Sequence, residues 1–451
     1  MEPAVIEAAG LAAFVETLRT RALFERGALV WVSRAPGRLD VMGGIADYSG
    51  SLVLERPIAE AAWAAAQRVD RPLLEIVSLG RPACTIALDA LAPGGVPASY
   101  DDARRMFEDS PHRWAAYIAG VVLVLARERS LPLTSGLRIV VASEVPEGKG
   151  VSSSAAVETA SMSAVAAAFE LPIEPRDLAI FCQTAENLVA GAPCGVMDQM
   201  TCVFGEPSAL LALLCQPAEL QASVPLPGDV AFWGLDSGER HAVGGSDYRA
   251  VRTGAFMGLR ILGEHAGVPG NYLANIAPEQ FERELAHLLP EEMTGADFLA
   301  RYGGTVDPVT SVASGGRYGV RAPAAHPVYE RWRVETFRDL LLARSGETGR
   351  RRLGELMYES HASYARCGLG SEGTDRLVAL VRAEGPAAGL YGARITGGGS
   401  GGTVAVLGRR DAAPAIARVA DAYERLTGYR PHIFAGSSPG VAAFGIQSVV
   451  V

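Results

Sequence analysis

Residues 146–156 read Pro146-Glu-Gly-Lys-Gly-Val-Ser-Ser-Ser-Ala-Ala156, a glycine- and serine-rich turn between a strand-like run over 137–142 and a helical pattern that begins near Ser153. A glycine-rich turn that opens a helix points unpaired backbone N–H groups and the positive end of the helix dipole at an anion. An ordinary serine N-cap is the simpler alternative, although three serines exceed what one cap needs. The spacing differs from the G-x-x-x-x-G-K-[ST] nucleotide loop, so the pattern predicts a phosphate site of another kind.

A second glycine-rich segment precedes this turn. Residues 35–50 follow a strand-like run over 29–33, and they carry Arg38, Asp40 and Asp47 among five glycine and proline residues. We expect the segment to break the strand and to hold these charges on an irregular loop. A surface turn with solvated charges is the simpler alternative, but catalytic groups concentrate on loops held by a rigid scaffold.

A third segment, Thr396-Gly-Gly-Gly-Ser-Gly-Gly402, contains both G-x-G-x-x-G and G-x-S-x-G. These patterns are typical of dinucleotide-binding folds and of serine hydrolases, and both require a helix directly afterwards. Residues 403–407 are strand-like instead, which disfavours both an NAD- or flavin-dependent oxidoreductase and a hydrolase. The segment therefore predicts a hairpin whose backbone closes tightly around a ligand.

Two acidic residues lie between the second and third segments. Glu186 stands near the C-terminus of a helical pattern, and Asp198 follows a Pro-Cys-Gly break inside the apolar run 196–198. An acid in such a run is costly to bury unless it is paired or functional. A salt-bridged loop acid and a catalytic acid remain open at this point.

The composition excludes several classes of protein. The chain has 451 residues, 49% hydrophobic and 20% charged, so it buries a sizeable core and is not disordered as a whole. Its net charge of 41 − 50 = −9 gives no basic field for nucleic acid or an anionic membrane. The six cysteines form no C-x-x-C pair, and no basic, apolar leader opens the chain. We expect a cytoplasmic protein with neither nucleic acid nor membrane as a partner.

The periodicity indicates a mixed α+β protein. A boundary is expected over 216–228, and the Gly- and Pro-rich stretch 303–327 is expected to form a loop or lid over a site. Helical patterns cover 6–26, 114–127, 153–169, 175–189, 247–266, 328–343 and 349–366, and strand-like runs cover 29–33, 137–142, 209–214, 230–235 and 403–407.

Taken in order, the three glycine-rich segments resemble the three motifs of the GHMP kinases, the family of galacto-, homoserine, mevalonate and phosphomevalonate kinases. The resemblance runs from about residue 30 to the end and is nearest to the galactokinase branch, through Gly37-Arg38 and Asp47-Tyr48 and through Gly195-Val-Met-Asp-Gln199. Residues 37–54, 192–200 and 237–252 look most like the kinase region of L-arabinokinases.

This resemblance implies a two-domain fold with the active site in the cleft between the domains. It implies a helical extension over 1–27, an ATP-binding domain over 28–220 of the ribosomal S5 domain 2-like type with a left-handed βαβ unit, and a ferredoxin-like domain over 221–451. The family transfers the γ-phosphoryl group of ATP to a hydroxyl with the help of Mg²⁺. We expect a monomer or a weak homodimer.

The resemblance also assigns roles to residues. Asp198 would be the general base, and Arg38 would hold it ionised and neutralise the moving phosphoryl group. Ser154, with Ser153 as the alternative, and Glu186 would hold Mg²⁺. Trp114 and Tyr117 would lie near the adenine, although core aromatic residues are an equal alternative. The remaining ATP-site residues would be Gly148, Lys149, Gly150, Val151, Ser152 and Ala155, with Gly397, Gly398, Gly399 and Gly401 in the third motif.

One departure bears on the acceptor sugar. Galactokinases carry Glu-His where this chain has Gly44 and Ile45, and those side chains face the C6 hydroxyl of the sugar. L-Arabinopyranose has the ring stereochemistry of D-galactopyranose without that CH₂OH group, so the sequence favours an L-arabinose 1-kinase. A galactokinase and a catalytically silent sugar/ATP sensor are the alternatives. The sugar would be bound by Asp40, Gly44, Ile45, Asp47, Gly195 and Tyr248.

Overall fold

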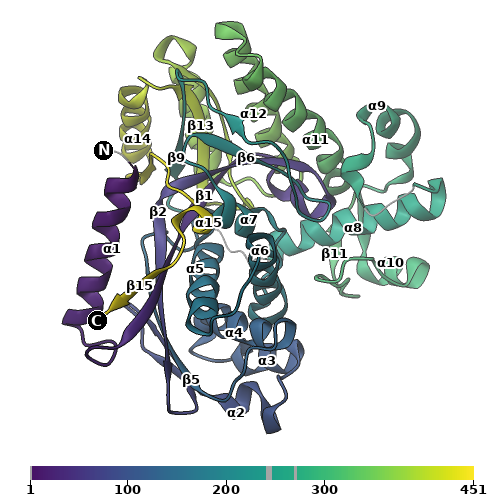
Figure 1. Ribbon diagram of the computed structural model, residues 1–451. Coiled ribbons are helices and arrows are strands. Elements are labelled where there is room, and N and C mark those ends of the chain that lie inside the picture. The colour runs from purple at the N-terminus through teal and green to yellow at the C-terminus, as the bar shows by residue number, and fades with distance from the viewer. Residues whose placement is uncertain (1–2, 240–245, 269–271) are drawn as a thin grey trace.

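The computed structural model describes residues 3–239, 246–268 and 272–451, which form two main β-sheets with helices packed around them (Figure 1). The resemblance over 237–252 lies partly outside the described residues, because 240–245 are not among them. Within the described ranges, no helix combines the length and the apolarity needed to cross a bilayer.

The first sheet has the strand order β15-β1-β2-β5-β3-β4, with β6 beside β2 and the short strands β7 and β8 beside β6. Its neighbours are antiparallel except for β3 and β5, which are parallel. The strands are β1 (Leu29–Met42), β2 (Leu52–Val69), β3 (Leu73–Ser78), β4 (Cys84–Ala87), β5 (Gly136–Ser143), β6 (Ala209–Leu214), β7 (Glu219–Leu220), β8 (Val224–Pro225) and β15 (Gln447–Val450).

Strand β1 corrects one prediction. We expected an irregular loop from residue 35 onward, but the strand continues to Met42 and pairs Arg38 with Pro57 and Asp40 with Glu55 of β2. Register shifts after Pro36 and after Asp40 absorb the turn-forming residues as irregularities within the ladder. Only Asp47 lies in a turn, the 3-10 segment Gly44–Ser49.

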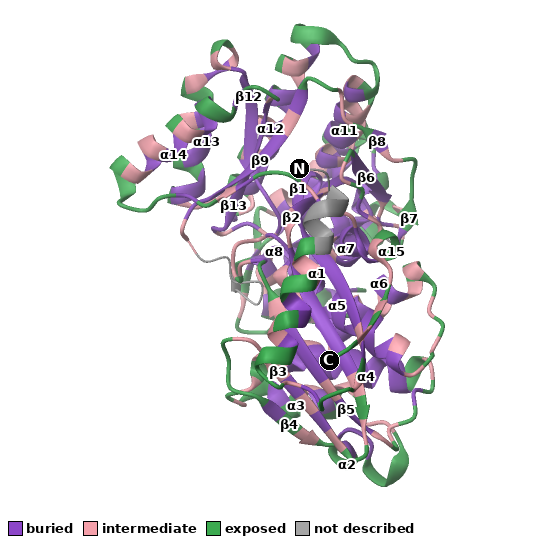
Figure 2. Cartoon of the chain, turned by 60° about the vertical axis from the view of Figure 1, so that its left-hand side comes forward, coloured by how far each residue is buried: buried purple, intermediate pink, exposed green. Residues whose placement is uncertain are grey.

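Both faces of the first sheet are covered, because successive side chains of a strand point to opposite faces. Ala64 of β2 belongs to the core formed with α4 and α5, whereas its neighbour Trp63 packs against Phe14 of α1 (Figure 2). Helix α1 of the N-terminal extension thus covers the outer face of this sheet, and the helix ends at Thr20 rather than at residue 26, where the helical pattern ends. The helices of this domain are α1 (Pro3–Thr20), α2 (Leu88–Leu91), α3 (Tyr100–Glu108), α4 (Ala116–Glu128), α5 (Ser153–Ala168), α6 (Pro175–Thr184) and α7 (Met197–Phe204).

The second sheet is antiparallel, in the order β12-β13-β9-β14. The chain changes sheets after β8, inside the predicted boundary over 216–228, but β15 pairs with β1 again and returns to the first sheet. The predicted domain over 221–451 would place the end of the chain with the second sheet. In the structure, β15 belongs to the first sheet instead. The elements are β9 (Val230–Asp236), β12 (Leu390–Ile395), β13 (Thr403–Arg409), β14 (Ile433–Phe434), α12 (Gly346–Arg366), α13 (Glu372–Glu384), α14 (Ala413–Thr427) and the connecting α15 (Val441–Phe444).

A third, mainly helical layer stands at the right of Figure 1 and has its own core around Phe256, Phe298 and Leu285. The predicted irregular stretch 303–327 is shorter in the structure, because β11 begins at Arg317 and α11 continues straight through Pro327. The layer consists of α8 (Ser246–Ala266), α9 (Pro278–Gln280), α10 (Gly295–Tyr302), α11 (Arg321–Leu342) and the pair β10 (Glu292–Thr294) and β11 (Arg317–Gly319).

A buried ion pair joins the two sheets. Arg394 of β12 donates from Nη1 to Oδ2 of Asp40 in β1 at 2.8 Å, and both side chains are 0% exposed. Asp40 also accepts from the backbone N–H of Gly44 and of Gly397, and its own N–H donates to Thr396 Oγ1. The glycine-rich segments 35–50 and 396–402 are therefore fixed to one carboxylate.

Replacing Arg394 with methionine should destabilise the fold strongly, because Asp40 would be left as an unpaired buried charge. Losses from breaking such a pair are about 3–5 kcal/mol, measurable by urea unfolding. Arg409→Met is the matched control, since Arg409 pairs with the exposed Asp411, and it should leave the unfolding midpoint unchanged. Equal midpoints for the two variants would show that the Asp40–Arg394 pair does not hold the sheets together.

Candidate active site

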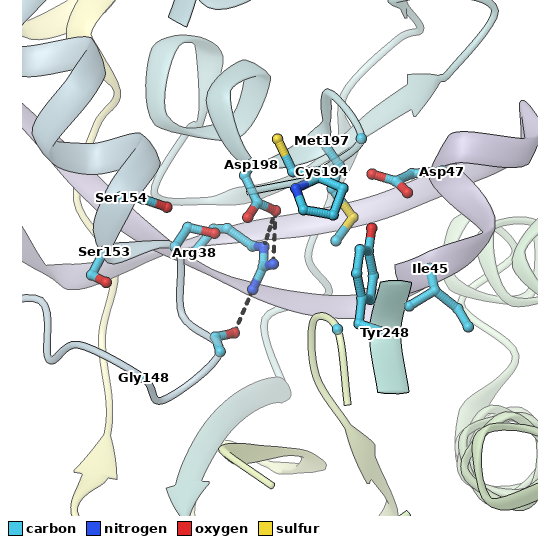
Figure 3. A pocket seen from close by; sticks show the side chains of 15 residues that line it. Arg38, Ile45, Asp47, Gly148, Ser153, Ser154, Cys194, Met197, Asp198 and Tyr248 are labelled. Carbon is cyan, nitrogen blue, oxygen red and sulfur yellow. Dashed lines mark hydrogen bonds and ion pairs between the residues drawn. The ribbon is translucent and has the colours of Figure 1, made fainter. Parts of the chain in front are cut away.

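A cavity at the meeting point of the glycine-rich segments collects most of the predicted site residues (Figure 3). Motif residues far apart in the chain face one another there. Its lining consists of Arg38, Ile45, Asp47, Gly148, Gly150, Ser152, Ser153, Ser154, Pro193, Cys194, Gly195, Met197, Asp198, Tyr248 and Gly398.

Asp198 and Arg38 form an ion pair in the middle of the cavity. Asp198 stands in the first turn of α7, and its Oδ1 accepts from Arg38 Nε at 2.9 Å and from Nη2 at 2.7 Å. Arg38 Nη1 also donates to the carbonyl of Gly150 at 2.6 Å. Desolvation acts to lower the pKa of Arg38, but the carboxylates of Asp198 and Glu55 raise it overall. The arginine thus stays charged and links the acid to the serine-rich loop.

One end of the cavity is built to receive an anion. Gly148, Gly150 and Ser152 have φ of 70°, 68° and 62°, so the loop coils in the left-handed region just before α5. Ser152 occupies the N-cap position but its side chain makes no capping hydrogen bond, and within the described structure its buried Oγ has no partner. The ordinary serine cap is therefore not what this residue provides. An unpaired hydroxyl at a helix N-terminus suits a phosphate oxygen.

Lys149, Val151 and Ala155 were predicted to belong to the ATP site, and none of the three lines the cavity. Lys149 Nζ lies 2.9 Å from Asp236 Oδ2 on β9, and its carbonyl accepts from Thr403 Oγ1. Val151 and Ala155 are buried in the core beneath the loop. These three residues hold the loop in place, while its glycines and serines face the cavity.

Glu186 lies behind the serines, in the π-helical segment Ala185–Ala190 that follows α6. It is 1% exposed, and Gln199 Nε2 donates to its Oε2 at 2.6 Å. Burial raises the pKa of Glu186 to about 7 and the charge of Asp198 adds to the rise, whereas hydrogen bonding with Ser154 opposes it. The buried Glu158 stands beside it, and burial and Glu186 raise its pKa well above the usual range.

The described residues include no group of three or more His, Cys, Asp or Glu side chains arranged to hold a metal. The Ser154 hydroxyl nevertheless lies close enough to the Glu186 carboxyl to act against the rise of its pKa. Two hard oxygen donors beside a phosphate site fit Mg²⁺, which keeps several water ligands.

The other end of the cavity is formed by Ile45, Asp47, Gly195 and Tyr248. A Cβ on Gly195 would lie 1.6 Å from Asp47 Oδ2, so only glycine allows the carboxylate its place. Burial raises the pKa of Asp47 to about 7, with a further contribution from Asp198, while Arg252 opposes the rise. This end offers one carboxylate and one phenol beside the apolar Ile45.

Gly44 and Asp40 are not part of the cavity lining, in contrast to the prediction for both. A Cβ on Gly44 would lie 1.7 Å from Tyr364 Oη and 2.7 Å from Asp40 Oδ2, and the residue has φ of +46°. Glycine is required there because the Asp40–Arg394 pair and Tyr364 fill the space. Asp40 serves that network instead of facing the cavity.

The third motif is the predicted hairpin between β12 and β13. Gly397, Gly399 and Gly401 have φ of 68°, 80° and 104°, and Gly398 faces the cavity. The described cavity lining includes neither Trp114 nor Tyr117. Trp114 packs against the main core under the guanidinium of Arg81, and Tyr117 is held near Glu186, with burial raising its pKa.

Several residues around the cavity were missed. Glu55 is fully buried, with Oε2 3.4 Å from Arg38 Nε. It lies in the apolar run 52–55, so the criterion that singled out Asp198 also applies to it. Pro193, Cys194 and Met197 adjoin predicted residues in the chain. Gln199 is the last residue of the matching segment Gly195-Val-Met-Asp-Gln199, but no role was predicted for it.

Comparison with known proteins agrees with this arrangement. Residues 116–206 match the GHMP kinases N terminal domain, and residues 342–425 match the GHMP kinases C terminal domain. A galactokinase of Chloroflexus aggregans is 31% identical over 83% of this chain and 83% of its own. The chain belongs to the GHMP kinase family.

An L-arabinokinase of Arabidopsis thaliana is 46% identical over 92% of this chain, which spans 46% of that longer protein. Among solved structures, Lactococcus lactis galactokinase complexed with galactose superposes with a TM-score of 0.76 over 98% of this chain and 100% of that one. At 21% sequence identity this likeness shows the shared fold.

The packing role of Gly44 can be tested without any substrate. Gly44→Ala should lower the free energy of unfolding, because its methyl group would collide with Tyr364 Oη. Tyr364→Phe removes that oxygen, so the double variant should lose less than the sum of the two single losses. Urea unfolding of the four proteins measures the coupling. Strict additivity would contradict the contact.

Proposed function

We propose that this protein is an ATP- and Mg²⁺-dependent sugar kinase that phosphorylates the anomeric hydroxyl of L-arabinose, giving L-arabinose 1-phosphate and ADP. The observation that carries the proposal is the position of the Asp198–Arg38 pair. It lies between a serine-lined anion site and an end that offers Asp47 and Tyr248 to hydroxyl groups. The likeness to an L-arabinokinase and to galactokinases supports the choice of a sugar.

Asp198 would accept the proton of the anomeric hydroxyl as that oxygen bonds to the γ-phosphorus, and the bond from phosphorus to the β,γ-bridging oxygen breaks to release ADP. Both bonds from Arg38 reach Oδ1, and within the described structure no hydrogen bond reaches Oδ2. That oxygen is the one available to the sugar. The charge of Arg38 would stabilise the negative charge on the transferring phosphoryl group.

Ser154 and Glu186 would hold the Mg²⁺ ion, which neutralises charge on the β- and γ-phosphates when bound. Gly148, Gly150 and Ser152 would surround the phosphate oxygens with N–H groups and one hydroxyl. The positive end of the α5 dipole lies at the same place.

The choice of pentose rests on Ile45. Its side chain lines the cavity and has no hydrogen-bonding group, whereas Gly44 faces away from it. A galactose O6 placed against this wall would lose its hydrogen bonds, at a cost of about 1–3 kcal/mol. That cost corresponds to roughly 5–150-fold in kcat/KM.

A sugar panel tests the function directly. Sugar-dependent ADP release should be fastest with L-arabinose, and NMR of the product should place the phosphate on C1. A higher kcat/KM on D-galactose would make the protein a galactokinase, and no turnover with any pentose or hexose would favour a silent sensor.

Asp198→Asn should lower kcat by at least about 100-fold, the lower range for loss of a general acid–base group. Sugar affinity, measured by calorimetry, should change little, because the amide keeps the size of the side chain. A near-normal kcat in this variant would refute the assignment of Asp198 as the base.

A further inference from the structure

A second cavity of about 480 Å³ lies behind the proposed sugar site. Asp47, Cys194 and Gly195 line both cavities, so they form a thin wall between them. Arg252 of α8 and Asp307 line only the second cavity. Arg252 and Asp307 therefore lie on the side of Asp47 that faces the second cavity.

Arg252 is fixed in that position by contacts in every direction. Its Nε and Nη2 donate to the two carboxylate oxygens of Asp307 at 2.9 and 2.8 Å, and its Nη1 donates to the carbonyl of Cys194 at 3.1 Å. The guanidinium also lies over the rings of Tyr48 and Phe256, with its carbon 5.3 and 5.7 Å from their centres. Such a pre-organised cation loses little freedom when it acts on a neighbour.

Asp307 in turn fixes the irregular segment 303–316. The backbone N–H of Val309 donates to its Oδ1, and the N–H and hydroxyl of Thr310 donate to its Oδ2. The stretch expected to be a loop or lid is thus fastened to α8 through Arg252, and residues 306–309 line the second cavity.

The charges around Asp47 determine how easily its carboxyl group ionises. Asp198 on α7 repels a negative charge on Asp47, whereas Arg252 on α8 and Arg38 on β1 stabilise it, and Arg252 contributes more than Arg38. Tyr48, Tyr248 and Cys215 are the other titratable groups that face it. Arg38 already shares its charge with Asp198 and Glu55, so Arg252 is the cation whose effect falls chiefly on Asp47 and Asp307.

We propose that Arg252 is a positioning residue for the acceptor site: it keeps Asp47 ionised so that this carboxylate accepts two sugar hydroxyls, and it fixes the Cys194–Gly195 wall beside it. The inference rests on the proposed sugar kinase activity. Asp307 acts through Arg252 by holding the guanidinium in place. Neither residue lines the first cavity, where ATP and the transferring phosphoryl group would lie.

The test compares Arg252→Gln and Arg252→Lys with Arg249→Gln between pH 6 and 9. Arg249 lies on the same helix and donates to the carbonyl of Gly191 in the same loop, but it is not among the largest influences on the pKa of Asp47. Steady-state kinetics give kcat, the KM for sugar and the KM for ATP.

A rise of one unit in the pKa of Asp47, from about 7, lowers its ionised fraction at pH 7 from about one half to about one eleventh. Arg252→Gln should therefore raise the sugar KM about fivefold at pH 7. Because the carboxylate binds sugar only when ionised, the acidic limb of kcat/KM for sugar should move to higher pH and the loss should shrink toward pH 9. The KM for ATP should stay unchanged. Arg252→Lys should keep the limb near its original pH, and Arg249→Gln should leave all three constants unchanged.

An unchanged sugar KM, or a loss of equal size at every pH, would overturn the proposal. Should Arg252→Gln not fold, Asp307→Asn provides the second variant, and it should raise the sugar KM without moving the KM for ATP. Absence of turnover in the unmodified protein refutes the proposed function itself, which separates that failure from the failure of this inference.

Discussion

The buried ion pair between Asp40 and Arg394 joins strands that are 354 residues apart in the chain. Its carboxylate accepts hydrogen bonds from the N–H groups of Gly44 and Gly397, so the glycine-rich segments 35–50 and 396–402 are held by the same side chain. The cavity exists only where these segments meet the serine-rich loop. A pair in such a low-dielectric place is expensive to desolvate, and its value lies in fixing one relative position of the two sheets.

The cavity and its surroundings gather acidic side chains in the interior of an acidic protein. Five acidic residues in this region are largely or fully buried: Asp47, Glu55, Glu158, Glu186 and Asp198. Burial raises the pKa values of the first four. Two arginines, Arg38 and Arg252, are the main counter-charges on opposite sides of this group. Such a site favours the binding of cations and of ligands that bring a cation with them. A nucleotide that arrives with its metal satisfies this requirement.

The motifs could be predicted from the sequence, whereas the roles of several residues within and beside them could not. Glycine-rich segments, strand-like runs and the acid at Asp198 are local signals, and the structure contains them where they were expected. The resemblance to the family predicted that Gly44, Asp40 and Lys149 bind a ligand. In the structure, they contact other residues of the protein. The partners that decide these roles are distant in sequence. No local pattern states that Tyr364 fills the space in front of Gly44.

The last strand, β15, pairs with β1 although nearly the whole chain separates them. During synthesis, one edge of the first sheet therefore stays incomplete until residues 447–450 leave the ribosome. Until then, the edge of β1 over 29–32 presents unpaired backbone groups, and such edges invite pairing with other chains. Helix α1, already made, packs on the face of the same sheet and ties its Arg19 to the carbonyl of Val450 only at the end. Strand β1 is thus the first strand to be synthesised, and this edge of it is paired only by the last strand.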